Sequence, residues 1–251
     1  MILSDESTWP AELLTALECR RDIFLDKELR MTKAGPAERW NASRWDAAVY
    51  ELCDVIKPFT IRGYHCARLT EHEIGTILSE GLSLPDLAML KARITKLQKS
   101  GAITQRIARR LIAENQGAEA NRARRIWFCF FPPRFASQYG IERFFRSWGG
   151  EALYNDHERD PATGPVLGKI GTPCLVEADV PMAGIELRIS LVIHTARQFL
   201  LNRGLKTREP AEHEDFVISP IPRDNIIRVI RFPDADFLKL TDCHEWDPPL
   251  D

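Results

Sequence analysis

The chain has 251 residues and a mass of 28.7 kDa, enough to bury a hydrophobic core without disulfide or metal staples. Hydrophobic residues make up 44% of it and charged residues 28%, which excludes a disordered or collagen-like chain. The net charge is −2, with 34 basic and 36 acidic residues, which excludes a polycation that coats nucleic acid along its whole length.

The sequence predicts a protein of the cytoplasm that neither enters a membrane nor holds a metal. No apolar run approaches the roughly 18 residues of a membrane helix, and the acidic start lacks the basic region of a secretory signal. The six cysteines are dispersed and none forms a CxxC pair, which predicts reduced thiols, mostly buried as small hydrophobic residues.

Periodicity predicts three regions, 1–58, 59–232 and 233–251. The first is helical, over 9–31 and 43–57, and the last is an acidic tail that trails over the surface. The middle region mixes both types of element. Strands are expected at 59–69, 126–131, 174–180, 216–219 and 226–232. Helices are expected at 71–80, 83–101, 103–115 and 134–148.

Two segments of the middle region have weaker patterns. Residues 155–172 read as a loop, and 185–203 fit either a strand or a helix that Gly204 ends. Strands and helices follow one another without strict βαβ alternation. This order predicts an α+β fold rather than a doubly wound parallel sheet.

Charge is concentrated in residues 91–125, which hold ten basic residues against two acidic ones, a net charge of +8. A nucleic-acid-binding arm would have this composition, because each neutralised phosphate releases counterions. Two solvated helices with cations facing water would have it too. The nucleic-acid-binding interpretation assigns six arginines to phosphate contacts: Arg106, Arg109, Arg110, Arg122, Arg124 and Arg125.

Common catalytic fingerprints are missing from the sequence. It contains no GxGxxG, no P-loop, no GxSxG and no paired zinc-ligand spacing. Three other segments hold the residue types of a site that cleaves NAD. They are Gly63–Leu69 with the helix after it, Ile126–Phe131 followed by Ser137 and Tyr139, and Glu214–Ile218 followed by Ile221-Pro222.

These segments resemble the ADP-ribosyltransferase superfamily over roughly residues 60–232. The first resembles its first NAD-binding strand, and the second resembles the "IYFA…S..Y" region of the poly(ADP-ribose) polymerase-like branch. The third is similar to the ending of DarT-type toxins, where the glutamate is catalytic. The first two motifs lie 62 positions apart, and the basic stretch fills the extra length. Trp127 or Phe128 stands where that branch has its first tyrosine.

The resemblance implies a split β-sheet core with a helical N-terminal region and a basic helical insertion at 91–125. It also implies roles for single residues. Glu214 and His65 are the expected catalytic residues, with Glu212 and Asp215 as close rivals of Glu214, and His65 is expected to hold the adenosine ribose. The remaining NAD contacts fall on Tyr64, Cys66, Arg68, Trp127, Phe128 and Tyr139, with Arg134 as an alternative to Arg68 at the pyrophosphate.

The chemistry of NAD cleavage suits one carboxylate and flat apolar faces. Nicotinamide leaves as a neutral ring without a general acid, so the site must stabilise an oxocarbenium-like state. A carboxylate at the ribose does this and is also able to take the proton of the acceptor. Each aromatic has a structural alternative, since residues of this kind usually fill a core.

The leading hypothesis is therefore a mono-ADP-ribosyltransferase that uses NAD as cosubstrate and modifies RNA or DNA. By family analogy it is a toxin or anti-phage effector, with an antitoxin or immunity protein as partner. Three alternatives stay open. The first is the same enzyme with a protein target, the second an inactive relative that binds a nucleotide or RNA, and the third an RNA 2′-phosphotransferase.

Overall fold

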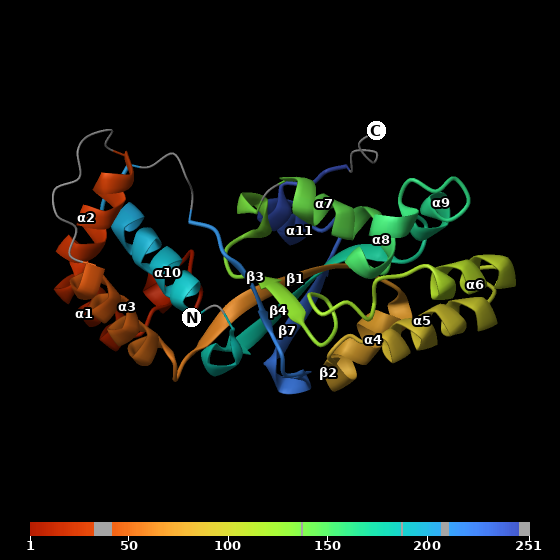
Figure 1. Cartoon of the computed structure of the whole chain (residues 1–251), viewed down its shortest axis with the longest axis horizontal. Helices are drawn as coiled ribbons and strands as arrows, with labels where there is room; N and C mark the ends of the chain where they lie inside the picture. The colour runs from red at the N-terminus through yellow and green to blue at the C-terminus, as the bar shows by residue number, and fades with distance from the viewer. Residues whose placement is uncertain (33–41, 137, 187, 207–210, 246–251) are drawn as a thin grey trace.

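The computed structural model describes residues 1–32, 42–136, 138–186, 188–206 and 211–245. Its centre is an antiparallel five-stranded sheet with helices on both faces (Figure 1). The strand order is β5-β3-β1-β4-β7, and a small β2-β6 ladder lies beside it. These strands are β1 Thr60–Leu69, β2 Gly81–Leu82, β3 Ile126–Cys129, β4 Thr172–Pro181, β5 Glu214–Val217, β6 Ile221–Pro222 and β7 Ile226–Arg231. The general α+β prediction is confirmed.

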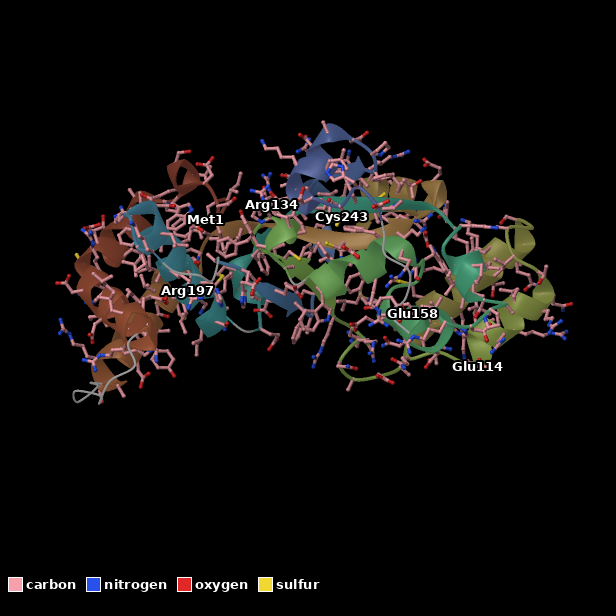
Figure 2. The ribbon with its side chains drawn as sticks, turned by 90° about the horizontal axis from the view of Figure 1, so that it is seen from above. Met1, Glu114, Arg134, Glu158, Arg197 and Cys243 are labelled. Carbon is pink, nitrogen blue, oxygen red and sulfur yellow. The ribbon has the colours of Figure 1, made fainter. Side chains whose placement is uncertain are left out.

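Helices form groups at the two ends of the sheet and on its faces (Figure 1). At one end lie α1 Ala11–Cys19, α2 Arg21–Thr32, α3 Ala42–Ile56 and α10 Arg188–Asn202. At the other lie α4 Glu71–Glu80, α5 Leu87–Lys99 and α6 Gln105–Ala113. Along one face lie α7 Gln138–Arg146, α8 Glu151–His157, α9 Gly164–Leu167 and α11 Ala235–Thr241. Viewed from above, Arg197 marks the first group and Glu114 the opposite end (Figure 2).

The predicted helices and strands agree closely with the structure where the punctuation is strong. The helix α4 begins with a complete capping box, in which Thr70 and Glu73 satisfy each other's backbone N–H groups. It ends at Gly81, whose φ of 89° suits glycine. The helical stretch predicted over 9–31 is divided at Arg20 into α1 and α2. The helix α5 begins later than predicted, because the side chain of Asp86 caps it by accepting from the Met89 N–H at 2.7 Å.

Most of the ambiguous segment 185–203 is the helix α10, which packs with the N-terminal helices, while Ile185 at its start forms a bridge with Val217 of the edge strand β5. Leu191, Phe199 and Leu200 are buried in one core that also contains residues of α1, α3, β1 and β4. The N-terminal region therefore shares its core with the sheet.

The loop predicted at 155–172 is wrong, because it contains the end of α8 and the whole of α9. The contacts of His157 explain why this segment is ordered. It is fully buried, with Nδ1 at 3.1 Å from Thr163 Oγ1 and Nε2 at 2.6 Å from the Glu114 carbonyl oxygen. Asp160 then accepts from the backbone N–H groups of Ala162 and Thr163. The glycines and prolines of this segment thus separate short helices.

The prediction of a trailing tail after Phe232 is also wrong, because residues 235–241 form α11 against the sheet. Phe237 is fully buried and packs edge-on against Phe145 at 5.0 Å and Phe232 at 5.8 Å. The segment is rich in acidic residues, so its composition alone did not indicate that one side of the helix is apolar. Residues 246–251 lie outside the described residues.

We expect Phe237→Ala to lower the free energy of unfolding by about 3–5 kcal/mol, since it removes a buried ring between two others. Urea unfolding measures this loss. Asp236→Ala, at an exposed position of the same helix, serves as the control. A change below about 1 kcal/mol for Phe237→Ala would mean that α11 does not anchor the chain.

Candidate active site at the β5-β3-β1 edge

The three segments that carry the motifs form adjacent strands, although they lie far apart in the sequence. Tyr64 of β1 is paired with Cys129 of β3, and Cys129 is paired with Glu214 of β5. Directly opposite residues of an antiparallel pair share a face of the sheet. Tyr64, Cys129 and Glu214 therefore lie in one row on the face that α7 covers.

Trp127 and Phe216 form the next row on that face. They are directly paired, and their ring centroids lie 4.9 Å apart. Phe216 is buried, whereas Trp127 keeps 38% of its surface exposed. The guanidinium of Arg125 also lies over the Phe216 ring, 4.2 Å from its centroid. The sheet edge therefore carries a cluster of Trp127, Phe216 and Arg125 one row away from Glu214.

Glu214 is the exposed first residue of the edge strand β5. Partial burial raises the pKa of its carboxyl group, and the nearby carboxylates of Glu212 and Glu151 raise it further, while His213 lowers it. A carboxylate that is short of compensating cations favours positive charge beside it. This is the electrostatic property that an oxocarbenium-like state requires.

His65 lies on the opposite face of the sheet from Glu214. Its ring contacts Phe128 edge-on at 6.0 Å, and Phe128 pairs with the buried Asp215 on that same face. His65 Nδ1 lies 2.9 Å from the Trp127 carbonyl oxygen. Burial lowers the pKa of His65, so the neutral ring donates from Nδ1 and keeps Nε2 as an acceptor. This hydrogen bond of His65 links β1 to β3.

The other predicted NAD contacts are divided between core and surface. Tyr64 and Cys66 are buried beneath α7, and Phe128 is buried on the other face. Tyr139 belongs to α7, so its backbone lies over the Glu214 face, but its side chain is outside the described residues.

The two arginines expected at the pyrophosphate are bound to backbone carbonyl groups. Arg68 donates to the Ile170 oxygen at 2.7 Å and to the Phe145 oxygen at 2.9 Å. Arg134 donates to the Lys239 oxygen at 2.5 Å and lies over Phe135. It sits above the middle of the sheet near Cys243 (Figure 2). Both arginines hold secondary-structure elements together.

The basic stretch separates into structural and exposed cations. Arg93 pairs with Glu73 at 2.6 Å, Arg110 with Asp160 at 2.6 Å, and Arg122 with Glu119 and Glu151. The exposed cations appear in none of the ion pairs of the described residues: Lys91, Lys96, Lys99, Arg106, Arg109 and Arg124. These six, which we call the exposed cation set, are available for phosphates, whereas Arg110 and Arg122 already have carboxylate partners.

Comparison of the chain with family models, curated proteins and solved structures finds no match. The function of the chain is therefore inferred from its own residues and their geometry. In the described part of the chain, no helix is long and apolar enough to cross a bilayer, and no group of three or more His, Cys, Asp or Glu residues is arranged to hold a metal ion.

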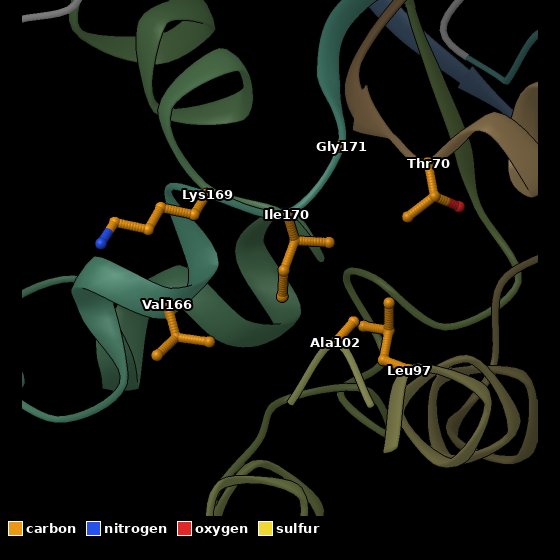
Figure 3. Close-up of a pocket in the computed structure, with 7 residues that line it drawn as sticks. All are labelled: Thr70, Leu97, Ala102, Val166, Lys169, Ile170 and Gly171. Atoms are coloured by element: carbon orange, nitrogen blue, oxygen red, sulfur yellow. The ribbon is translucent and has the colours of Figure 1, made fainter. Parts of the chain in front are cut away.

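Two surface cavities lie away from Glu214. One, of about 320 Å³, opens between α5, α9 and the junction of β1 with α4, with Leu97, Val166 and Ile170 in its wall (Figure 3). The other, of about 370 Å³, lies between β7 and the start of α11. Neither is lined by His65, Trp127 or Glu214.

Sequence reasoning missed a pair of histidines that lies at β5 on the face of the sheet opposite to Glu214. His213 stacks on His194 of α10 at 5.4 Å, and its Nε2 lies 3.3 Å from Asp215 Oδ2. The Nδ1 atom of His194 is buried without a hydrogen-bond partner. Burial, together with His213 and Arg197, lowers the pKa of His194 to about 4. Residues 213 and 215 flank Glu214, so this pair holds the strand that presents the carboxylate.

We expect the fold to lose stability in acid because of His194. Its pKa is lower in the folded chain than the ordinary 6.5, so its contribution is complete above pH 6.5 and is lost as the pH falls towards 4. Between pH 7.5 and 4.5 the loss amounts to roughly 2–3 kcal/mol. Urea unfolding of wild type and His194→Leu at both values measures it.

The exposed His72 of α4 provides the matched control, as His72→Gln. We expect His194→Leu to flatten the pH dependence and His72→Gln to leave it unchanged. Equal acid sensitivity in wild type and His194→Leu would show that other groups govern the transition.

Proposed function

We propose that the protein is an NAD-dependent mono-ADP-ribosyltransferase that acts on nucleic acid, with its site on the Glu214 face of the β5-β3-β1 edge. The observation that carries the proposal is the row Tyr64–Cys129–Glu214, which joins the three motif strands side by side. It leaves Glu214 exposed at the start of the edge strand, beside the exposed ring of Trp127.

Glu214 is the catalytic residue in this proposal. The bond between the ribose C1′ and the nicotinamide nitrogen breaks, and its electron pair stays on the departing ring. Negative charge on Glu214 stabilises the positive charge that develops on the ribose. The acceptor lone pair then forms the new bond to C1′, and Glu214 or water takes the acceptor proton.

Trp127 offers an exposed face on which the nicotinamide ring stacks. His65 acts as a positioning residue, because its hydrogen bond to the Trp127 carbonyl oxygen fixes β3 beside β1. This role differs from a contact with the adenosine ribose, since His65 lies across the sheet from Glu214.

The acceptor class is supported by the exposed cation set. Lys91, Lys96 and Lys99 lie on α5, and Arg106 and Arg109 lie on α6, without ion-pair partners among the described residues. Arg124 is also exposed and directly precedes Arg125 in the chain. Cations without carboxylate partners are free to neutralise phosphates.

A catalytically inactive nucleic-acid-binding relative is the second candidate. The separation of His65 and Glu214 by the sheet favours this candidate. Both residues are expected to contact the same NAD molecule, but their side chains lie on opposite faces of the sheet.

Incubation with labelled NAD and separate pools of RNA, DNA and protein tests both candidates. We expect transfer of label to nucleic acid by wild type and none by Glu214→Gln. Label on protein would support the protein-target alternative. Binding of nucleic acid without consumption of NAD would support the inactive relative.

A further inference from the structure

Arg125 has a guanidinium group that the rest of the protein positions but does not neutralise. Its Cζ atom lies over the ring of Phe216, 4.2 Å from the ring centroid, and the same ring contacts Trp127. None of the hydrogen bonds or ion pairs of the described residues uses its side-chain nitrogens. The two arginines that precede it in the chain have different surroundings. Arg122 is paired with Glu119 and Glu151, and Arg124 is exposed.

The position of Arg125 over Phe216 limits where its N–H donors are presented. A guanidinium over an aromatic ring is held there by a cation–π attraction and keeps its planar N–H donors available to an anion. Arg125 is half-buried, and Phe216 is 8% exposed, so the cation lies at a partly desolvated position. An anion that reaches this position gains two parallel charge-assisted hydrogen bonds.

The spacing along the edge suits a dinucleotide whose ribose lies at Glu214. Glu214 and Phe216 are two residues apart on one face, which is about 7 Å along the strand. In NAD the pyrophosphate follows the 5′ carbon of the nicotinamide ribose. A ribose at the Glu214 carboxylate with its 5′ carbon turned towards Phe216 therefore brings the pyrophosphate towards Arg125.

The alternatives for this contact are already engaged. Arg68 and Arg134 donate to backbone carbonyl groups. We propose that Arg125, held over the ring of Phe216, is the residue that binds the pyrophosphate of NAD. This assignment rests on the proposed function and removes Arg125 from the nucleic-acid contacts expected of it.

Calorimetric titration of the full chain with NAD, with ADP and with nicotinamide tests the assignment. For Arg125→Gln we expect the affinities for NAD and ADP to fall together by roughly 10- to 100-fold, because both ligands contain the pyrophosphate. Binding of nicotinamide should not change. Arg125→Lys keeps the charge but not the planar donors, so we expect an intermediate loss.

Lys57→Gln is the matched control, since it removes one positive charge from an exposed position just after α3, away from the β5-β3-β1 edge. It should bind NAD as wild type does. Wild-type affinity for NAD in Arg125→Gln would overturn the assignment and leave the proposed function standing. Weaker nucleic-acid binding with unchanged NAD binding in Arg125→Gln would also overturn it, by assigning Arg125 to the acceptor. Wild-type protein that binds neither NAD nor ADP would overturn the proposed function itself.

Discussion

Glu214→Gln should lower the rate of NAD cleavage by roughly 100- to 1,000-fold while leaving the fold and NAD affinity near those of wild type. The amide keeps the size of the side chain and removes the negative charge, so only stabilisation of the oxocarbenium-like state is lost. One such electrostatic contact is worth about 3–4 kcal/mol of activation free energy. Single-turnover release of nicotinamide measures the chemical step directly.

Two neighbours of Glu214 provide the controls. Glu212→Gln removes an exposed carboxylate two residues before Glu214 in the chain. We expect this change to alter the rate by less than about tenfold. Asp215 is buried and accepts from the Phe216 N–H at 2.7 Å, so Asp215→Asn tests strand geometry rather than charge at the ribose. A loss confined to Glu212→Gln would move the catalytic role to that residue.

The pH profile of the same reaction gives a second readout of Glu214. The ionised carboxylate is the active form, so activity falls as the pH drops through a pKa that lies above the ordinary value for glutamate. Glu151 is one cause of that elevation. Glu151→Gln should therefore move the acid limb to lower pH, and an unmoved limb would mean that another group governs it.

Local sequence rules predicted elements well wherever one residue determines a local conformation. The capping box at Thr70 and the positive φ at Gly81 depend on atoms within one helical turn. The strand and helix patterns of β1, α3 and α4 follow for the same reason. The tail and 155–172 failed because their order depends on distant partners. Phe237 needs Phe145, and His157 needs the carbonyl oxygen of Glu114.

Strand register decides which predicted site residues lie together, and it was not readable from the motifs. Adjacent residues on a strand face opposite sides, so the YH dipeptide sends Tyr64 to the face of Glu214 and His65 away from it. The pairing of β1 with β3 and β5 is a non-local property. The motifs identified the three segments, whereas their pairing and the face that each residue shares required the structure.

Charge counting likewise located the basic stretch without separating its members. Ten cations give one net charge for the segment, but Arg93, Arg110 and Arg122 are paired with carboxylates from outside or within it. Asp160 and Glu151 are 50 and 29 residues from their arginine partners. Such pairs leave no local signature in the sequence.

Binding of nucleic acid to the exposed cation set should depend steeply on salt. Six phosphate contacts predict a slope of about −5 for log affinity against log salt on duplex DNA, and about −4 on a single strand. Raising salt from 50 to 200 mM would then weaken duplex binding by roughly three orders of magnitude. Fluorescence anisotropy with a labelled duplex and its single strand measures both slopes.

Reversal of charge on α6 tests which cations make these contacts. Arg106→Glu with Arg109→Glu should reduce the salt slope by about two and lower nucleic-acid binding by at least tenfold. Modification of nucleic acid falls with it, whereas slow hydrolysis of NAD by water continues. The two activities separate because α6 touches the acceptor and Glu214 touches the ribose.

Lys57→Glu with Lys239→Glu is the matched control, since it reverses the same number of exposed charges far from α5 and α6. It should leave the slope and both activities unchanged. Arg110→Glu belongs to a different experiment, because it breaks the pair with Asp160 and tests the attachment of α6. Equal loss of NAD hydrolysis and modification in the α6 variant would mean that these arginines support the fold. Unchanged modification would mean that the cations are only solvated, and an acceptor other than nucleic acid would then be favoured.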